Sequence, residues 1–367
     1  MANTEGPSPL LLFVLLAIAV IFCSSAGVCF ALMGTTVPPF LRASWRLWMQ
    51  ELFQLIPFIV EYRKSTIDKS KYRQTLPLLM FSGVLLGMHF SSWVWSIDNT
   101  SLTHALCWIS MYPICLNVGA WLLYFYVVKF SVRGLELCCC GYGIGDLGKD
   151  NVAKPSTLET VGTAIGLCGA LLMLLDAGKE GGGEGDNEVT VVGDLAAFFG
   201  AATMAGYLVI GQVLRKWLSI WLYAFPVCGA AILASLAFSF ASEDVTFLGF
   251  DDTSVFGFLT VRQLPYSLYL GACCGVAGHT LLNYLLGYMS PLVIASSLLL
   301  EPLVGSFIGW LVGVGSLPGL FTWLGGCVLM GGLLAVVWGE NVEREKQKKI
   351  LDLRVNEEEE NNKNSSL

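Results

Sequence analysis

Ten apolar runs divide the chain, and each is long enough to cross a lipid bilayer. They occupy residues 10–33, 39–60, 76–97, 103–128, 157–175, 193–213, 219–241, 266–288, 291–313 and 319–338. About 20 apolar residues in a helix span the hydrocarbon core of a bilayer. Because the runs are continuous rather than alternating, they predict helices. We therefore expect an all-α integral membrane protein with ten transmembrane helices.

The Lys and Arg residues are concentrated in alternate segments between these runs. Seventeen of the 21 lie in residues 61–75, 129–156 and 214–218 and in the tail from residue 339. The intervening loops contain only Lys179 and Arg262. Cytosolic loops carry an excess of Lys and Arg, so both termini are expected to be cytosolic. The run at 10–33 has no preceding basic residue and is too long for a signal-peptide core, which favours a retained span.

A Gly-rich acidic linker at residues 177–192 separates two halves, 1–176 and 193–338, with five runs each. The number five is odd, so two copies of such a unit would lie in opposite orientations in the membrane. The charged tail, residues 339–367, ends in EEEENNKNSSL and is expected to be disordered beyond an amphipathic start.

An insertion at residues 129–156 follows the fourth run and contains Cys138, Cys139 and Cys140. A cysteine cluster beside a membrane span is a candidate for S-palmitoylation. The alternative is an unmodified loop.

The two halves contain similar patterns in the same order. His89 precedes Pro113 by 24 residues in the first half, and His279 precedes Pro302 by 23 in the second. The fifth and tenth runs each contain a pair of glycines seven residues apart, at 162 and 169 and at 325 and 332. These matches predict a five-plus-five inverted repeat around a central cavity, an architecture common among secondary transporters.

Several segments carry a resemblance to a known family. They are GMHFSSWVWS at 87–96, GDLAAFFGAATMAGYLVIGQVLRK at 193–216, GHTLLNYLL at 278–286 and LEPLVGSFIGWL at 300–311. With the ten runs, they make the chain similar to the EamA-type branch of the drug/metabolite transporter superfamily. The resemblance implies a five-plus-five inverted repeat with a central cavity that exports or exchanges metabolites by alternating access.

Ionisable and polar residues at membrane depth are costly, so they are candidates for function. We expect a substrate site formed by His89, Trp93, Tyr112, His279, Asn283 and Glu301. Proton coupling is assigned to Glu51, His279 and Glu301, and Arg46 is a candidate charge partner. The alternative for each is helix packing through hydrogen bonds or, for Arg42, extension of the side chain to the membrane interface.

The amino-acid composition reduces the number of function classes that fit the chain. Only 13% of the residues are charged, about half the share usual in soluble domains, and no basic patch alternates with aromatic residues. We expect a small-molecule substrate and contact with membrane lipid. We expect no nucleic-acid partner, no cofactor and no metal. The sequence leaves open whether the chain forms a homodimer. The chain has no GxxxxGK[ST] fingerprint for ATP, so we expect a secondary transporter with proton-coupled export as one mode, and not an enzyme.

Three alternatives remain at this point. A sugar-phosphate or nucleotide-sugar exchanger of the same superfamily would favour several basic residues near the cavity, and only Arg42 and Arg46 qualify. An intramembrane protease is suggested by the spacing of His279 and Asn283, but the paired EExxxR that accompanies it is absent from the spans. A receptor or scaffold that transports nothing is the third.

Overall fold

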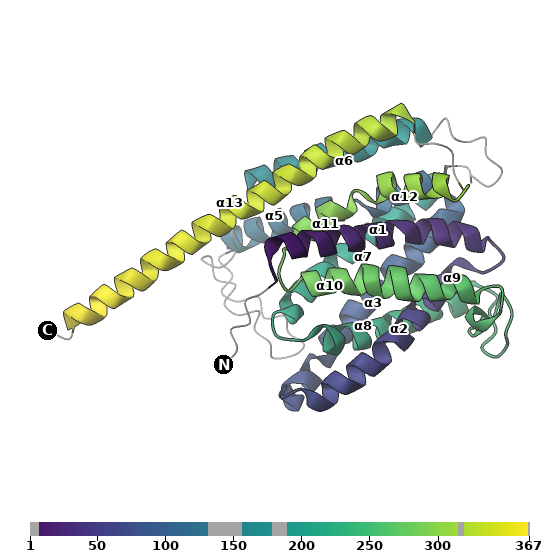
Figure 1. The fold of residues 1–367 in the computed structure, drawn as a ribbon, viewed down its shortest axis with the longest axis horizontal. Helices are drawn as coiled ribbons and strands as arrows, with labels where there is room; N and C mark the ends of the chain where they lie inside the picture. Colours follow the sequence, from purple (N-terminus) through teal and green to yellow (C-terminus); the bar gives the residue numbers. More distant parts are fainter. Residues whose placement is uncertain (1–6, 131–155, 178–188, 315–318, 366–367) are drawn as a thin grey trace.

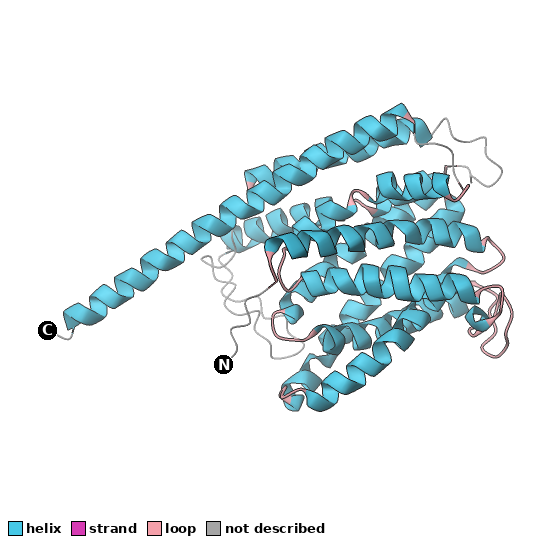
Figure 2. Cartoon of the chain, in the orientation of Figure 1, coloured by secondary structure: helices cyan, strands magenta, loops and turns pink. Residues whose placement is uncertain are grey.

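The structure is a computed structural model that describes residues 7–130, 156–177, 189–314 and 319–365. Within these residues the chain is all-helical, and β-pairing is limited to one isolated bridge between Thr246 and Ser254. The long helices run side by side in one bundle, with loops gathered at its two ends (Figures 1 and 2). Cys138, Cys139 and Cys140 lie outside the described residues.

The helices of the first half are α1 (Pro9–Met33), α2 (Pro39–Lys64), α3 (Lys69–Asn99), α4 (Leu102–Ile109), α5 (Tyr112–Phe130) and α6 (Thr157–Ala177). Those of the second half are α7 (Val191–Arg215), α8 (Ile220–Ser242), α9 (Leu264–Tyr269), α10 (Leu281–Leu285), α11 (Pro291–Leu298), α12 (Glu301–Leu311) and α13 (Leu320–Ser365). A 3₁₀ turn, η1 (Gly257–Leu259), lies in the loop before α9, and a π-helix, η2 (Leu270–Thr280), joins α9 to α10.

Eight of the described helical segments are long and apolar enough to cross a membrane. Two predicted spans are not in that set. One is α2, whose Arg42, Arg46, Glu51 and two glutamines lower its mean hydropathy. The other is the segment at 264–285, which changes from α to π and back. Large apolar side chains such as Leu10, Ile56 and Leu233 stand exposed on the outer faces, as expected for contact with lipid. The chain is a multi-pass membrane protein.

The fourth and ninth predicted spans are each broken in the middle. Ser110 and Met111 separate α4 from α5, and Leu299 and Leu300 separate α11 from α12. In both cases the second residue of the new helix is a proline, Pro113 or Pro302. Proline lacks an N–H and its ring clashes with the preceding turn, which weakens the backbone ladder where these two helices break. The expectation of two continuous helices is therefore wrong at these positions.

Helices α6 and α13 form a pair along one side of the bundle (Figure 1). Gly162 packs on the backbone of Gly332, and Gly169 packs on that of Gly325, so the two helices are antiparallel and very close. A Cβ atom at any of these glycines would meet the facing backbone. Small residues allow this approach, which lets two helices gain van der Waals contact where lipid offers no hydrophobic drive.

The C-terminal tail was expected to be disordered, and the described part of it is helical instead. Helix α13 continues through Ser365 and extends beyond the bundle (Figure 1). Residues 340–365 contain no Gly or Pro and many Glu and Lys residues, which favour helix. The part of α13 that extends beyond the bundle leaves it at the same end as the start of α1 (Figure 1).

Candidate functional site

A small buried cavity lies at the centre of the bundle, and side chains from both halves line it. The lining residues are Cys23, Arg46, His89, Phe90, Trp93, Ile109, Tyr112, Met204, His279, Leu282, Leu298 and Glu301. The space open to the centre of a water molecule is about 20 Å³. That is enough for about one water and not for an organic solute. The cavity contains five of the six predicted substrate residues, together with Arg46.

The two helix breaks bring Tyr112 and Glu301 together. Tyr112 is the first residue of α5, and Glu301 is the first residue of α12. The Tyr112 hydroxyl donates a hydrogen bond of 3.1 Å to Oε2 of Glu301. The two side chains come from opposite halves of the chain, so this bond joins the halves at the cavity. A carboxylate at the first position of a helix is also favoured by the helix dipole.

His89 is held in one orientation by the backbone of α7. Its Nδ1 lies 3.0 Å from the carbonyl oxygen of Gly200. A carbonyl can only accept, so Nδ1 carries the proton, and in the neutral ring Nε2 is an acceptor. The ring stacks on Trp93, with centroids 6.3 Å apart and planes 20° from parallel. His89 is thus fixed on one edge and offers its other nitrogen to the cavity.

His279 has no such fixed bond. It is 4% exposed, and neither of its ring nitrogens has a hydrogen-bond partner within the described chain. Its ring centroid lies 5.1 Å from that of Phe90, 5.7 Å from that of Tyr207 and 6.4 Å from that of His89. A buried polar group without a partner is costly, which makes His279 ready to bind a ligand or a water molecule.

Arg46 is the cationic residue of the cavity lining. It is 1% exposed, and its guanidinium carbon lies 3.9 Å from the centroid of the Phe90 ring. This cation–π contact supplies part of the stabilisation that the charge loses on leaving water. Among the described residues Arg46 forms no ion pair with a carboxylate, and its Nε has no hydrogen-bond partner. Nε1 of Trp93 is likewise unpaired.

Two predicted site residues are not brought to the cavity. Asn283 turns back along its own helix and donates from Nδ2 to the carbonyl of His279 at 2.9 Å. Glu51 faces α8, because a Cβ atom added at Gly229 would lie 3.3 Å from its Oε1. Five residues along an α-helix correspond to a rotation of about 140°, so Glu51 cannot share the cavity face of α2 with Arg46.

A polar link between α2 and η2 was missed in the sequence. Nε2 of Gln50 and Nε2 of Gln54 lie 3.2 and 2.8 Å from the hydroxyl of Thr280, the residue after His279. That hydroxyl donates in turn to the carbonyl of Gly275 at 3.1 Å. The signal in the sequence was the spacing of Gln50 and Gln54, which places both on one face of α2.

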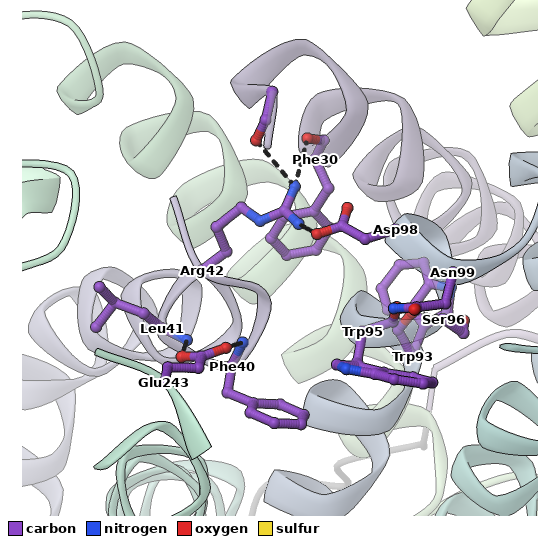
Figure 3. Close-up of polar contacts among 11 residues, drawn as sticks. Phe30, Phe40, Leu41, Arg42, Trp93, Trp95, Ser96, Asp98, Asn99 and Glu243 are labelled. Carbon is purple, nitrogen blue, oxygen red and sulfur yellow. Dashed lines mark hydrogen bonds and ion pairs between the residues drawn. The ribbon is translucent and has the colours of Figure 1, made fainter. Parts of the chain in front are cut away.

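A second charged cluster lies at the end of the bundle that holds the 243–263 loop. Arg42 forms an ion pair with Asp98 of α3 and donates to the carbonyl of Gly34 at 3.1 Å (Figure 3). Beside it, the carboxylate of Glu243 accepts hydrogen bonds from the backbone N–H groups of Phe40 and Leu41 at the start of α2 (Figure 3). The interpretation of Arg42 as reaching the interface is wrong, because it is 1% exposed and its charge is paired.

The described residues contain no group of three or more His, Cys, Asp or Glu side chains arranged to hold a metal ion. The polar groups that line the cavity are one guanidinium, one carboxylate, two imidazoles, a phenol, an indole and the thiol of Cys23. Such groups can bind and orient a solute and can exchange protons.

No protein-family model matches the chain, and no curated protein sequence matches it. A solved structure described only as "Crystal structure of protein" has the same fold, with a TM-score of 0.61. The match covers 92% of this chain and 100% of the other, at 15% sequence identity. At that identity the likeness establishes a shared helical fold and nothing about the substrate.

Proposed function

We propose that this protein is a secondary transporter that moves a small organic solute across a membrane by alternating access. In this proposal its ten helical segments form a five-plus-five inverted repeat of the EamA drug/metabolite transporter type, and no covalent chemistry occurs. The observation that carries the proposal is the central cavity, which both halves line with polar groups that lack partners and which is closed in this conformation.

The packing of the helices supports the inverted repeat. Helix α3 packs on α7 and α8, and the segment that contains η2, its counterpart in the second half, packs on α1 and α2. In the same way, α4 and α5 pack on α7, whereas α11 and α12 pack on α1. Exchange of partners between equivalent helices is what a two-fold axis in the membrane plane produces. The antiparallel pair of α6 and α13 fits the same symmetry.

The broken helices support a solute site at the midplane. Discontinuous helices in transporters place helix ends and freed backbone groups at the substrate. Here both breaks lie beside the cavity, and each presents the first residue of its second part, Tyr112 or Glu301, to the cavity. A cavity too small for a solute agrees with a closed intermediate between inward-open and outward-open states.

Transport in vesicles tests the proposal. The purified full chain would be reconstituted into liposomes, and counterflow of labelled carboxylates, amines, amino acids and nucleosides would be measured against protein-free liposomes. We expect counterflow of at least one class, and we expect Glu301→Gln to change its rate or pH profile while Asp252→Asn, a control in the 243–263 loop away from the cavity, does not. If no class is exchanged by well-folded protein, the chain is not a secondary transporter for these classes, and a receptor or scaffold becomes the better interpretation.

A further inference from the structure

We propose that the solute is a small organic anion with one carboxylate, that Arg46 binds this carboxylate, and that Glu301 takes up one proton when the anion enters. This inference rests on the proposed transport function and names its substrate class. The solute and the Glu301 carboxylate would alternate as the single negative charge that balances Arg46.

Two arginines one turn apart on α2 differ in the partners that surround them. Arg42 and Arg46 are both 1% exposed. Arg42 has an ion pair with Asp98 and hydrogen bonds to the backbone carbonyls of Phe30 and Gly34. Arg46 has the ring of Phe90 on one side, no carboxylate within ion-pair distance among the described residues, and an unpaired Nε. Glu301 shares the cavity with Arg46 but lies outside ion-pair distance, so within the described chain the guanidinium is free to form a direct ion pair with an anion from outside.

The neighbouring groups favour a carboxylate attached to a planar apolar body. Within the described chain, Trp93 offers an unpaired indole N–H and His279 offers two unpaired ring nitrogens. Phe90 and Trp93 supply aromatic walls. One guanidinium can hold one carboxylate through two parallel hydrogen bonds. A nucleotide or sugar phosphate carries more charge than this single cation balances, because Arg42 is already committed to Asp98.

Charge balance links Glu301 to the solute. The titratable or charged groups that line the cavity with Glu301 are Cys23 from α1, Arg46 from α2, His89 from α3, Tyr112 from α5 and His279 from η2. Glu301 is the one carboxyl among the lining residues, so with Glu301 ionised the empty cavity contains one positive and one negative charge. An entering anion would add an unbalanced charge at low dielectric, where isolated charges are costly. Protonation of Glu301 restores neutrality, so anion and proton enter together and no bond is made or broken in the solute.

Three probes of one shape and different charge test the substrate class. Benzoate, benzamide and benzylamine share a ring and differ in the attached group. We would measure their binding to the purified full chain by thermal stabilisation and calorimetry. We expect benzoate to bind at least about tenfold more tightly than either of the others. Arg46→Gln should remove this preference, Arg46→Lys should keep its sign, and Arg262→Gln, at an exposed arginine, should leave it unchanged.

Proton uptake tests the role of Glu301. Calorimetry of benzoate binding in two buffers of different ionisation enthalpy measures the protons bound per anion. We expect about one proton for the wild type, since one group balances one charge, and none for Glu301→Gln, which should still bind benzoate. The unliganded melting temperature of each variant shows whether it is folded.

Equal binding of the three probes, tighter binding of benzylamine, or proton uptake that persists in Glu301→Gln would overturn the inference. Counterflow of amines or neutral solutes without carboxylates would overturn the substrate class and leave the transport function standing. If none of the three probes binds and no counterflow of any solute occurs, both proposals fail.

Discussion

Arg42 and Arg46 show how one helix can use the same residue type for two purposes. Both side chains leave water completely, so each needs compensation inside the protein. Arg42 is compensated by the carboxylate of Asp98 and by the backbone carbonyls of Phe30 and Gly34. These contacts hold α2 against α1 and α3. Arg46 lies over the face of Phe90, and within the described part of the chain no carboxylate is within ion-pair distance of it. In our proposal Arg42 serves stability and Arg46 serves binding.

We predict that Asp98→Asn lowers stability by about 2–3 kcal/mol. Removing one partner of a buried pair leaves an uncompensated charge, which typically costs about 3–5 kcal/mol, and the value should be lower here because Asp98 is 17% exposed. The control is Asp252→Asn, which removes the charge opposite Arg262, a residue 66% exposed, and should cost less than about 0.5 kcal/mol. Unfolding midpoints in detergent compare the two variants, and equal midpoints would show that the Arg42 pair contributes no more than a surface pair.

For Arg46 we expect a substitution to have the opposite effect on stability. Arg46→Gln removes a buried charge that has no carboxylate within ion-pair distance among the described residues, and protonation of Glu301 keeps the cavity neutral without it, so the unliganded protein should be as stable as the wild type or more stable. The unfolding midpoint of Arg46→Gln in detergent measures this effect. A loss of more than about 2 kcal/mol, a size typical of a broken buried network, would mean that Arg46 serves packing instead of binding.

At the level of single residues, the sequence predicted which residues line the cavity better than it predicted what each of them contacts. A polar or aromatic residue with a polar group is conspicuous inside an apolar run. The sequence therefore identified six residues that line the cavity: His89, Trp93, Tyr112, His279, Glu301 and Arg46. Asp98 was missed as the partner of Arg42 because it lies near the end of a span, where a charge is ordinary. Asn283 was assigned by its spacing from His279, but its amide bonds to the backbone one turn back.

Among the elements, the helix breaks and the π-helix were beyond what hydropathy could predict, because apolar content does not depend on the hydrogen-bond pattern of the backbone. Pro113 and Pro302 were visible signals for the breaks. For the π-helix the signal is a difference in spacing. Gly87 precedes His89 by two residues, whereas Gly275, which packs on α2 as Gly87 packs on α8, precedes His279 by four. The backbone of η2 follows the i→i+5 pattern of a π-helix, and His279 near its end lines the cavity.

The glycine contacts of α13 give a prediction with a matched control. Gly332 and Gly331 are adjacent, but a Cβ atom at Gly332 would meet the backbone of Gly162 and Gly166, whereas one at Gly331 would meet nothing within 4 Å. We expect Gly332→Ala to destabilise the protein by about 1–3 kcal/mol because α6 and α13 must separate. Gly331→Ala should be neutral or stabilising by up to about 1 kcal/mol, since alanine favours helix. Thermal unfolding in detergent measures both, and similar effects would mean that the close pairing of α6 and α13 contributes little.

For the whole molecule, the span pattern predicted the order and position of the helical segments, because a bilayer requires long apolar helices whatever their contacts. The orientation in the membrane is a separate prediction from charge. The start of α3 and the 243–263 loop lie at opposite ends of the bundle (Figure 1). Lys69 is the first residue of α3, and Val261, which is 92% exposed, belongs to that loop.

Cysteine labelling tests this orientation. We expect a membrane-impermeant maleimide to label Val261→Cys in intact cells and to label Lys69→Cys only after permeabilisation, because the Lys69 end carries the excess of basic residues. Unsubstituted protein corrects for native cysteines, of which Cys168 and Cys327 are exposed on the helical surface. Labelling with the reverse pattern would place both termini outside.

The length of α13 has an electrostatic consequence. Its membrane-length part ends at Glu343, and the helix continues for 22 residues to Ser365, which is about 33 Å at 1.5 Å per residue. The four glutamates from Glu357 to Glu360 therefore begin about 21 Å beyond that point. Physiological salt screens charges in solution over about 8 Å, so the field of these glutamates fades before it reaches the bundle. The net charge of −7 thus overstates the negative potential felt at the cavity, and a chain shortened before Glu357 should keep the same local field around Arg46.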